Sequence, residues 1–451
     1  MSVPDPRRKK IGFIVRNISA FLAATSFSIS AQVERISVAD DESQAAADSY
    51  EAAVSDDGTV IAFRSSAENL VAGDANGWGD VFVRDMNSGS LDLVSLRPDG
   101  SPGTFFAMSP SISDDGATVV FVSKTPFSGV MVMTLAGLDT GVVEYPLPTT
   151  VNGNPSDRIG SAQLRPALSG DGRFVAFDNH TTLQDVYPPE VRPLNDDLNT
   201  TTDVFVLDLV SVPRVPMLRA SRNGNGDGGL GDSRGASISD DGRLVAFHSW
   251  SYNLAGNDPN DLPDIFVRDL IDGSTELVSV VPGDATSGND ESYGPMISGD
   301  GGHVVFRSRA DDLVAGDGNG RWDVFVRDLG ARITTRASVS SSGIEGNHHS
   351  MEASISDDGR FVAFRSLASN LVEGDDNARA DIFVRDTDSG QTARISTAFD
   401  GGDSDGNSYR PIISGNGEWI VFESDATNLV AGDTNGARDI FRAPNPLGGG
   451  Q

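Results

Sequence analysis

The residues best suited to bind a ligand are aspartates and asparagines that recur in one short loop. The pattern is Asp-x-Asn-x-x-x-Asp, and the chain contains six copies of it. Hard cations such as Ca²⁺ take oxygen ligands from short loops of this kind, at alternate positions near a tight turn. The pattern therefore predicts a weak, structural Ca²⁺ site in each copy. The candidate ligands are Asp74, Asn76, Asp80, Asp197, Asn199, Asp203, Asp258, Asn260, Asp264, Asp317, Asn319, Asp323, Asp375, Asn377, Asp381, Asp433, Asn435 and Asp439.

The same loops have a second interpretation that needs no metal. Asp and Asn side chains cap turns by bonding to the backbone, and a repeated turn copies its capping residues. A complete EF-hand loop also needs an acid at its twelfth position. Asp85 stands there by count from Asp74, but the intervening segment is expected to be extended, which places Asp85 about 16 Å from Asp80. Both interpretations, cation site and turn cap, stay open at this stage.

Familiar catalytic arrangements are weak in this chain. Residues 231–235 (GDSRG) fit the G-x-S-x-G pattern of hydrolases, but that motif needs a helix after the serine, and none is expected here. The five histidines share no recognisable spacing with a serine and an aspartate. His348 and His349 lie in a Gly/Ser loop, where the polarity of an exposed loop explains them more simply than a metal does. We therefore expect no catalytic residues and no cofactor other than Ca²⁺.

The acidic loops belong to a longer repeat that organises the whole chain. A turn of the form Ser-Asp-Asp-Gly, Ser-Gly-Asp-Gly or Ser-Gly-Asn-Gly recurs at intervals of 56 to 70 residues. Its glycine supplies the positive φ of a hairpin turn, and Asp or Asn tolerates that conformation. Regular repetition indicates one supersecondary unit stacked many times. The seven turns begin at Ser55, Ser113, Ser169, Ser239, Ser298, Ser356 and Ser414.

Each repeat is expected to contain four strands. In the sixth repeat, ASIS leads into the turn, FVAFRS from Phe361 follows it, DIFVRD from Asp381 is third and TARIST from Thr392 is fourth. The second and third segments are nearly unbroken apolar runs, which predicts that both of their faces are covered. Sheets stacked radially against one another meet that condition. We therefore predict an all-β, seven-bladed β-propeller with four antiparallel strands per blade.

The two ends of the chain sharpen this prediction. The last repeat stops after DIFR at Asp439 and lacks a fourth strand, whereas VERISV from Val33 precedes the first turn. The strands balance if this N-terminal strand closes the last blade, which also removes exposed sheet edges. An open solenoid would instead need capping repeats. The expected propeller spans residues 32–446, and residues 447–451 form a disordered tail.

The repeat resembles the TolB-like and WD-repeat-like β-propellers, in their exported bacterial form. The likeness rests on SDDGRFVAF from Ser356 followed by DIFVRD from Asp381, and it extends over nearly all of the chain after residue 31. The resemblance implies the propeller fold. It implies little about function, because this fold carries adaptors, binding partners and enzyme-associated modules alike.

Composition limits the partners and the compartment. The formal net charge is −31 and cysteine is absent, which excludes disulfides and thiolate metal sites and disfavours binding to nucleic acid or anionic membranes. Residues 1–31 resemble a signal peptide, with a basic segment at 7–10, an apolar stretch and small residues at 28–31. We expect a periplasmic or secreted protein that is not inserted in a membrane after signal cleavage, and a monomer.

The function expected from these features is that of a non-enzymatic exported scaffold that binds a protein or glycan partner through its loops. Two alternatives stay open. One is a propeller enzyme, a carbohydrate hydrolase or lyase, with its site at the central channel and ionisable groups drawn from several blades. The other is a Ca²⁺-dependent structural repeat protein of the envelope or matrix.

Overall fold

The computed structural model describes residues 33–449 apart from several internal gaps, and all structural statements below concern these residues. The gaps are 75, 98–99, 102, 104, 125–130, 138–140, 147–164, 180–200, 211–216 and 284–285. The expected signal peptide at 1–31 and two of the candidate ligands, Asp197 and Asn199, lie outside the described residues.

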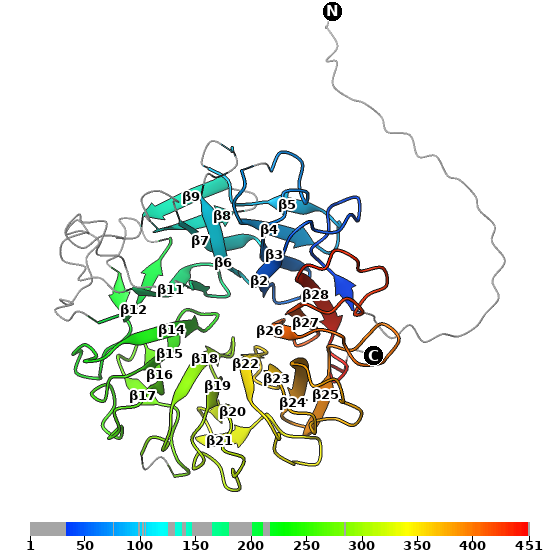
Figure 1. Ribbon diagram of the computed structural model, residues 1–451. Helices are drawn as coiled ribbons and strands as arrows, with labels where there is room; N and C mark the ends of the chain where they lie inside the picture. The colour runs from blue at the N-terminus through cyan, green and yellow to red at the C-terminus, as the bar shows by residue number, and fades with distance from the viewer. Residues whose placement is uncertain are drawn as a thin grey trace, which may run out of the picture. The chain divides into compact units, whose positions relative to one another are not determined.

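The described residues form 28 strands and no helix, so no helix that could cross a membrane is found among them. The strands make seven antiparallel sheets of four, the blades of a ring (Figure 1). Blade 1 contains β2 (Ser49–Val54), β3 (Val60–Ser65), β4 (Asp80–Asp85) and β5 (Leu91–Leu93). Blade 2 contains β6 (Phe106–Ile112), β7 (Thr118–Lys124), β8 (Met131–Gly137) and β9 (Gly141–Pro146). Blade 3 contains β10 (Ala167–Leu168), β11 (Phe174–Asn179), β12 (Asp203–Asp208) and β13 (Leu218–Arg219).

The remaining blades follow in chain order. Blade 4 contains β14 (Ser233–Ile238), β15 (Leu244–Ser249), β16 (Asp264–Asp269) and β17 (Thr275–Leu277). Blade 5 contains β18 (Ser292–Ile297), β19 (His303–Ser308), β20 (Asp323–Asp328) and β21 (Ile333–Arg336). Blade 6 contains β22 (Ser350–Ile355), β23 (Phe361–Ser366), β24 (Asp381–Asp386) and β25 (Gln391–Arg394). Blade 7 contains β26 (Ser408–Ile413), β27 (Trp419–Ser424), β28 (Asp439–Pro444) and β1 (Glu34–Arg35).

The N-terminal strand closes the ring. In β1, Glu34 pairs with Arg442 of β28 and Arg35 pairs with Phe441. The pairing continues beyond β1, where the backbone N–H of Ile36 donates to the carbonyl of Ile440 at 2.8 Å. The prediction of an all-β, seven-bladed propeller whose last blade is completed by the N-terminal strand is confirmed.

The apolar second and third strands are buried on both faces, as their sequence indicates. Inside a blade, a phenylalanine of the second strand lies beside one of the third, with ring centres 5.8 Å apart for Phe63 and Phe82. Between blades, Val81 and Val83 of β4 pack against Val119 of β7. Aromatic pairs of this kind contribute about 0.5–1.5 kcal/mol beyond the area that they bury. The same pairing recurs in Phe177–Phe205, Phe247–Phe266, Phe306–Phe325, Phe364–Phe383 and Phe422–Phe441.

The first strand of a blade lines the central channel and carries a bulge. In β22, Met351 pairs with Arg365 and Ser354 with Ala363, so the strand holds one extra residue. Glu352, inside this bulge, has φ 52°. A bulge bends its strand and redirects side chains, and in six of the described blades it brings a variable position to the channel. The residues with positive φ at this position are Glu51, Ser109, Gly235, Gly294, Glu352 and Arg410.

Candidate functional site

A cavity of about 570 Å³ lies in the channel between the first strands of the seven blades. Small apolar residues form much of its wall, and the bulges bring charged side chains to it. A concave site with a few polar groups among apolar ones is the usual form of a ligand pocket. The charged residues that line it are Glu51, Arg165, Arg307, Glu352 and Arg410.

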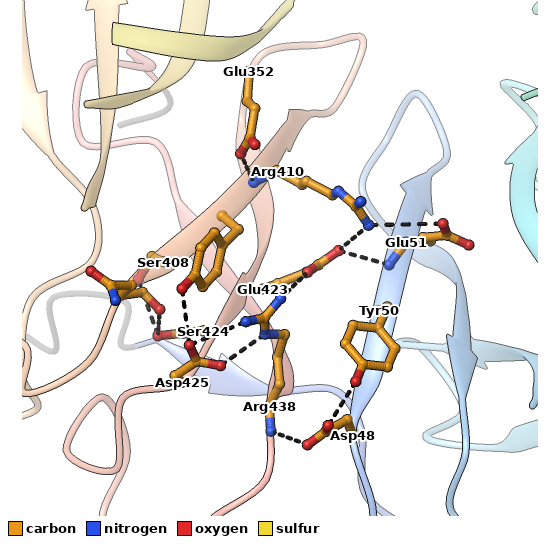
Figure 2. A network of polar contacts seen from close by, with 12 residues as sticks. Asp48, Tyr50, Glu51, Glu352, Ser408, Arg410, Glu423, Ser424, Asp425 and Arg438 are labelled. Carbon is orange, nitrogen blue, oxygen red and sulfur yellow. Dashed lines mark hydrogen bonds and ion pairs between the residues drawn. The ribbon is translucent and has the colours of Figure 1, made fainter. Parts of the chain in front are cut away.

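On the side of blades 7 and 1, the charges satisfy one another (Figure 2). Glu423, only 1% exposed, is at the centre of this network. Its Oε1 accepts a hydrogen bond from the backbone N–H of Glu51 at 2.8 Å and lies 3.3 Å from Nη1 of Arg410. Its Oε2 lies 3.4 Å from Nη1 of Arg438. Glu352 accepts a hydrogen bond from the backbone N–H of Arg410 at 3.0 Å. This network holds neighbouring blades together.

On the side of blades 4 and 5, a cation lacks such a partner. The guanidinium carbon of Arg307 in β19 lies 5.7 Å from the ring centre of Tyr293 and 5.4 Å from that of Trp322. Within the part of the chain that the structure describes, Arg307 has no hydrogen bond and no ion pair, and its Nε is buried. Arginine stays charged at any physiological pH. A half-buried guanidinium without an ion pair therefore lies at the channel, and the carboxylate of Glu352, which pairs with Arg365, attracts it only from beyond ion-pair distance.

Aromatic side chains surround this arginine. The ring of His248 lies 5.5 Å from Trp250 and 5.2 Å from Tyr293, and Tyr293 lies 5.8 Å from Trp322. Burial lowers the pKa of His248 to about 3, and the positive charges of Arg307 and Arg234 add to the effect. The imidazole is therefore neutral at physiological pH, and its Nδ1 is buried without a hydrogen-bond partner among the described residues. We call His248, Trp250, Tyr293, Arg307 and Trp322 the Arg307 cluster.

Acidic side chains gather at the other end of the channel, where the hairpin turns meet. Backbone hydrogen bonds join these turns from blade to blade, for example from the N–H of Asp240 to the carbonyl of Gly299 at 3.1 Å. Burial and repulsion between carboxylates raise the pKa of Asp114 to about 6 and that of Asp240 to about 7. We call this group the turn ring, and its members are Asp56, Asp114, Asp240 and Asp357.

Glycine at the equivalent position of the three other blades makes room for these carboxylates. A Cβ on Gly299 would lie 2.1 Å from Oδ2 of Asp240, and a Cβ on Gly415 would lie 2.1 Å from Oδ2 of Asp357. Such distances are far inside van der Waals contact. The alternation of Ser-Asp-Asp-Gly with Ser-Gly-Asp-Gly and Ser-Gly-Asn-Gly turns therefore has a steric cause that the sequence alone does not reveal.

In the acidic loops, the asparagine acts as a turn cap. Oδ1 of Asn76 accepts a hydrogen bond from the N–H of Trp78 at 2.8 Å, and its Nδ2 donates to Oδ2 of Asp80, also at 2.8 Å. Ser95 of the fourth strand donates to the other oxygen of Asp80 at 2.5 Å. These are the contacts of the turn-cap interpretation. The asparagine-to-aspartate contact recurs in Asn319–Asp323, Asn377–Asp381 and Asn435–Asp439.

A guanidinium occupies the place between the two aspartates in several blades. Nη1 of Arg336 lies 2.9 Å from Oδ1 of Asp317 and 3.6 Å from Oδ2 of Asp323. Across the described residues, no three His, Cys, Asp or Glu side chains are grouped as a metal site. In these blades an arginine therefore supplies the positive charge that the pattern led us to expect from Ca²⁺. The other pairs are Arg35–Asp433, Arg35–Asp439, Arg219–Asp203 and Arg394–Asp375.

The remaining candidates from sequence have structural roles. Ser233 of the G-x-S-x-G segment is fully buried and shares a hydrogen bond with Ser249 at 2.9 Å between their Oγ atoms. Nδ1 of His349 accepts from the N–H of Trp322 at 3.0 Å, and Nδ1 of His348 accepts from the N–H of His349 at 2.8 Å. Both histidines thus cap the backbone beside the Arg307 cluster.

No protein family and no characterised relative matches the sequence, but many solved propellers are similar in structure. Oligogalacturonate lyase from Vibrio parahaemolyticus has a TM-score of 0.53 at 13% identity, covering 93% of this chain and 98% of the other. The propeller domain of the Trilobed protease from Pyrococcus furiosus has a TM-score of 0.51 at 11% identity, covering 88% and 95%. TolB from Acinetobacter baumannii scores 0.41 at 17% identity, covering 75% and 63%. The β-propeller fold that the resemblance implied is confirmed.

Proposed function

We propose that this chain is an exported, non-enzymatic propeller that binds an anionic partner, a protein or a glycan, at the Arg307 cluster. The observation that carries the proposal is the unpaired guanidinium of Arg307, stacked beside Tyr293 and Trp322 at the wall of the channel cavity. The chain has 65 Asp and Glu residues against 34 Lys and Arg. Acids are thus abundant, yet none of the described ones lies within ion-pair distance of Arg307, and its counterpart Arg64 in β3 shares this lack without lining the cavity.

The chemistry of the cluster suits recognition. Arginine and large aromatic residues are enriched among the side chains that dominate binding energy. A guanidinium presents a planar fork that matches a carboxylate, and stacking on aromatic rings holds it in place before a ligand arrives. The ring of blades supplies a rigid support for such a site. The signal-like segment at 1–31 and the acidic composition support a periplasmic or secreted location and a monomeric state.

Titration calorimetry with two acidic probes, an oligogalacturonate and a Glu-rich peptide, tests this proposal. A neutral oligosaccharide is the reference ligand and should not bind. We expect one acidic probe to bind the wild type, and Arg307→Ala to weaken that binding about 30-fold, the loss that corresponds to a central contact of about 2 kcal/mol.

The matched control is Arg365→Ala. Arg365 follows the buried phenylalanine of β23 as Arg307 does in β19, but it is paired with Glu352 at 3.3 Å. This variant should change the affinity less than 3-fold, because its charge is already compensated. Failure of both acidic probes to bind at millimolar concentration, or an equal loss in the two variants, would contradict the proposal.

A second candidate function is a carbohydrate hydrolase or lyase at the same place. It is favoured by His248, a neutral imidazole with an unpartnered Nδ1 next to Arg307, because that nitrogen can accept a hydrogen bond from a bound substrate; proton abstraction would require the substrate to raise its low pKa. One structurally similar protein is an oligogalacturonate lyase. Incubation with oligogalacturonate distinguishes the two functions. An enzyme would form shortened or unsaturated products and lose that activity in His248→Gln, whereas a scaffold would bind the sugar and leave it intact.

A further inference from the structure

The repeat allows one position to be compared across blades. Two residues before the buried serine of the fourth strand, four blades carry arginine and two carry leucine. The acidic loop that faces this position has the same Asp-x-Asn-x-x-x-Asp pattern in all six. The six loops therefore share the same acidic pattern, but only four of the blades have an arginine that could compensate its negative charge. The arginines are Arg35, Arg219, Arg336 and Arg394, and the leucines are Leu93 and Leu277.

The arginine blades show where a cation belongs. In blade 7, Nη1 of Arg35 lies 2.9 Å from Oδ1 of Asp433 and 3.4 Å from Oδ2 of Asp439. Blade 5 repeats this arrangement. A single nitrogen thus lies within ion-pair distance of both carboxylates. The two carboxylates therefore converge on one position. A Ca²⁺ ion at that position would need somewhat shorter contacts, since its oxygen ligands lie 2.3–2.6 Å away.

Blade 4 keeps the acids and lacks the arginine. Asp258 is 6% exposed and Asp264 is fully buried. Neither carboxylate oxygen of Asp258, nor Oδ2 of Asp264, has a hydrogen bond of good geometry among the described residues; the donors near Asp258 are the backbone N–H of Asn260 and the hydroxyl of Ser287. The side chain of Asn260 lies near Asp264, but its hydrogen bonds of good geometry go to Oγ of Ser287 at 2.7 Å and to the carbonyl of Gly288 at 3.0 Å. Two buried carboxylates without a compensating cation are strongly unfavourable.

We propose that blade 4 binds a divalent cation, Ca²⁺, between Asp258 and Asp264, at the place where its sister blades hold a guanidinium. The two carboxylates neutralise the charge of the ion and supply the hard oxygen ligands that Ca²⁺ prefers. Ser287 stands where blades 5 and 6 have an acid, Glu345 and Asp403, in the isolated bridge to the fourth strand. Its small side chain leaves room for water, which completes the coordination.

Blade 1 carries the other leucine, Leu93, and Oδ1 of its Asp74 also lacks a hydrogen-bond partner among the described residues, but its last aspartate is satisfied. Both oxygens of Asp80 accept hydrogen bonds, one from Asn76 and one from Ser95. The proposal is therefore limited to blade 4. It is independent of the partner-binding function, because it rests on a separate set of residues.

Calorimetric titration of the full chain with CaCl₂, after removal of metal with a chelator, tests the site directly. We expect saturable binding by the wild type and the loss of one equivalent of Ca²⁺ in Asp258→Asn. Leu277→Arg should lose the same equivalent, because it installs the guanidinium of the sister blades. The control is Asp317→Asn in blade 5, where Arg336 occupies the site, and its stoichiometry should equal that of the wild type.

Thermal melts give a second readout. Millimolar Ca²⁺ should raise the melting temperature of the wild type through binding linkage, and Leu277→Arg should abolish that rise. If Leu277→Arg does not fold, Asp258→Asn supplies the same comparison. The proposal is overturned if the wild type shows no saturable binding up to millimolar Ca²⁺, if Asp258→Asn retains full stoichiometry, or if Asp317→Asn loses as much Ca²⁺ as Asp258→Asn does.

Discussion

The turn ring should make the propeller lose stability as the pH rises, and Asp240→Asn isolates this effect. Burial, followed by repulsion from Asp114 and Asp56, raises the pKa of Asp240 from 3.8 to about 7. The folded protein therefore keeps a proton that the unfolded chain releases at lower pH. The stability that this proton contributes is fully present below the unfolded pKa and is lost as the pH rises through the folded pKa.

The size of the effect follows from this shift. The excess of protons bound by the folded state falls from nearly one at pH 5 to about half at pH 7, and integration over this range gives about 2.3 kcal/mol. Asp240 is only half-buried, so solvent screening reduces this to about 1 kcal/mol. Asparagine has the same shape and no charge. The stability of Asp240→Asn relative to wild type should therefore increase by about 1 kcal/mol between pH 5 and pH 7, and level off at pH 8.

Urea unfolding followed by tryptophan fluorescence at pH 5, 6, 7 and 8, with a chelator present, measures this difference. The matched control is Asp241→Asn in the same turn. Asp241 accepts hydrogen bonds from Ser239 and from the N–H of Arg243, and Asn416 already makes the corresponding contact with Ser414 in blade 7. The control keeps the Asp240 carboxyl and removes only one of the charges that repel it, so its difference from wild type should change less with pH than that of Asp240→Asn. A pH-independent difference for Asp240→Asn, or a loss of its stability at pH 8, would refute the reasoning.

Two further predictions concern the ion pairs that join blades. Glu423→Gln removes the buried charge that faces Arg410 and Arg438. It should lower the free energy of unfolding, measured with urea, by about 2–4 kcal/mol, because breaking a buried pair leaves its partner uncompensated. The control Asp425→Asn, at a more exposed site beside Arg438, should lower it by less than about 1 kcal/mol. Equal losses in the two variants would contradict this account. Arg35→Ala leaves Asp433 and Asp439 unpaired where β1 closes the ring. We expect a loss of about 3 kcal/mol and faster proteolysis near residue 35, and an unchanged digestion rate would contradict it.

The fold could be predicted from sequence because its determinants are local and repeated. Each Ser-x-Asp/Asn-Gly turn specifies a hairpin through the chemistry of four neighbouring residues. Each apolar run, such as FVAFRS from Phe361, specifies a strand covered on both faces. The closure by β1 followed from counting strands. The repeat that ends after Asp439 lacks a fourth strand, and the segment from Val33 is a single strand that belongs to no other blade. No long-range contact had to be known.

The candidate site could not be predicted in the same way, because it depends on contacts between distant residues. Asp56 and Asp357 belong to blades 1 and 6, and they come together in the turn ring only when the propeller has closed. Arg307 and Arg64 lack an ion pair among the described residues, whereas Arg365 at the equivalent position pairs with Glu352. An internal alignment of the repeats contains one usable signal: the residue after the second-strand phenylalanine varies, as in His248, while its neighbours stay nearly constant.

The acidic loops show the same limit from another direction. The sequence pattern treats six copies as equivalent, but the charge at each loop is decided by a residue on the fourth strand, such as Arg336 or Leu277, that lies outside the motif. Four loops are compensated by arginine. The prediction of metal in all six copies stays a prediction, and our proposal concerns blade 4; the turn-cap contacts of the asparagine give the pattern a structural role that needs no metal.

In a repeat protein, features shared by all blades are explained by the fold, so function is best sought where one blade departs from the rest. Two such departures meet on a single connection of blade 4. The segment between β15 and β16 begins with Trp250 of the Arg307 cluster and leads through Asp258 to Asp264. A cation held by these aspartates would fix one end of the connection, while the other end contributes Trp250 to the Arg307 cluster. Blades 4 and 5 thus bring together an arginine and a pair of carboxylates that each lack an ion pair among the described residues.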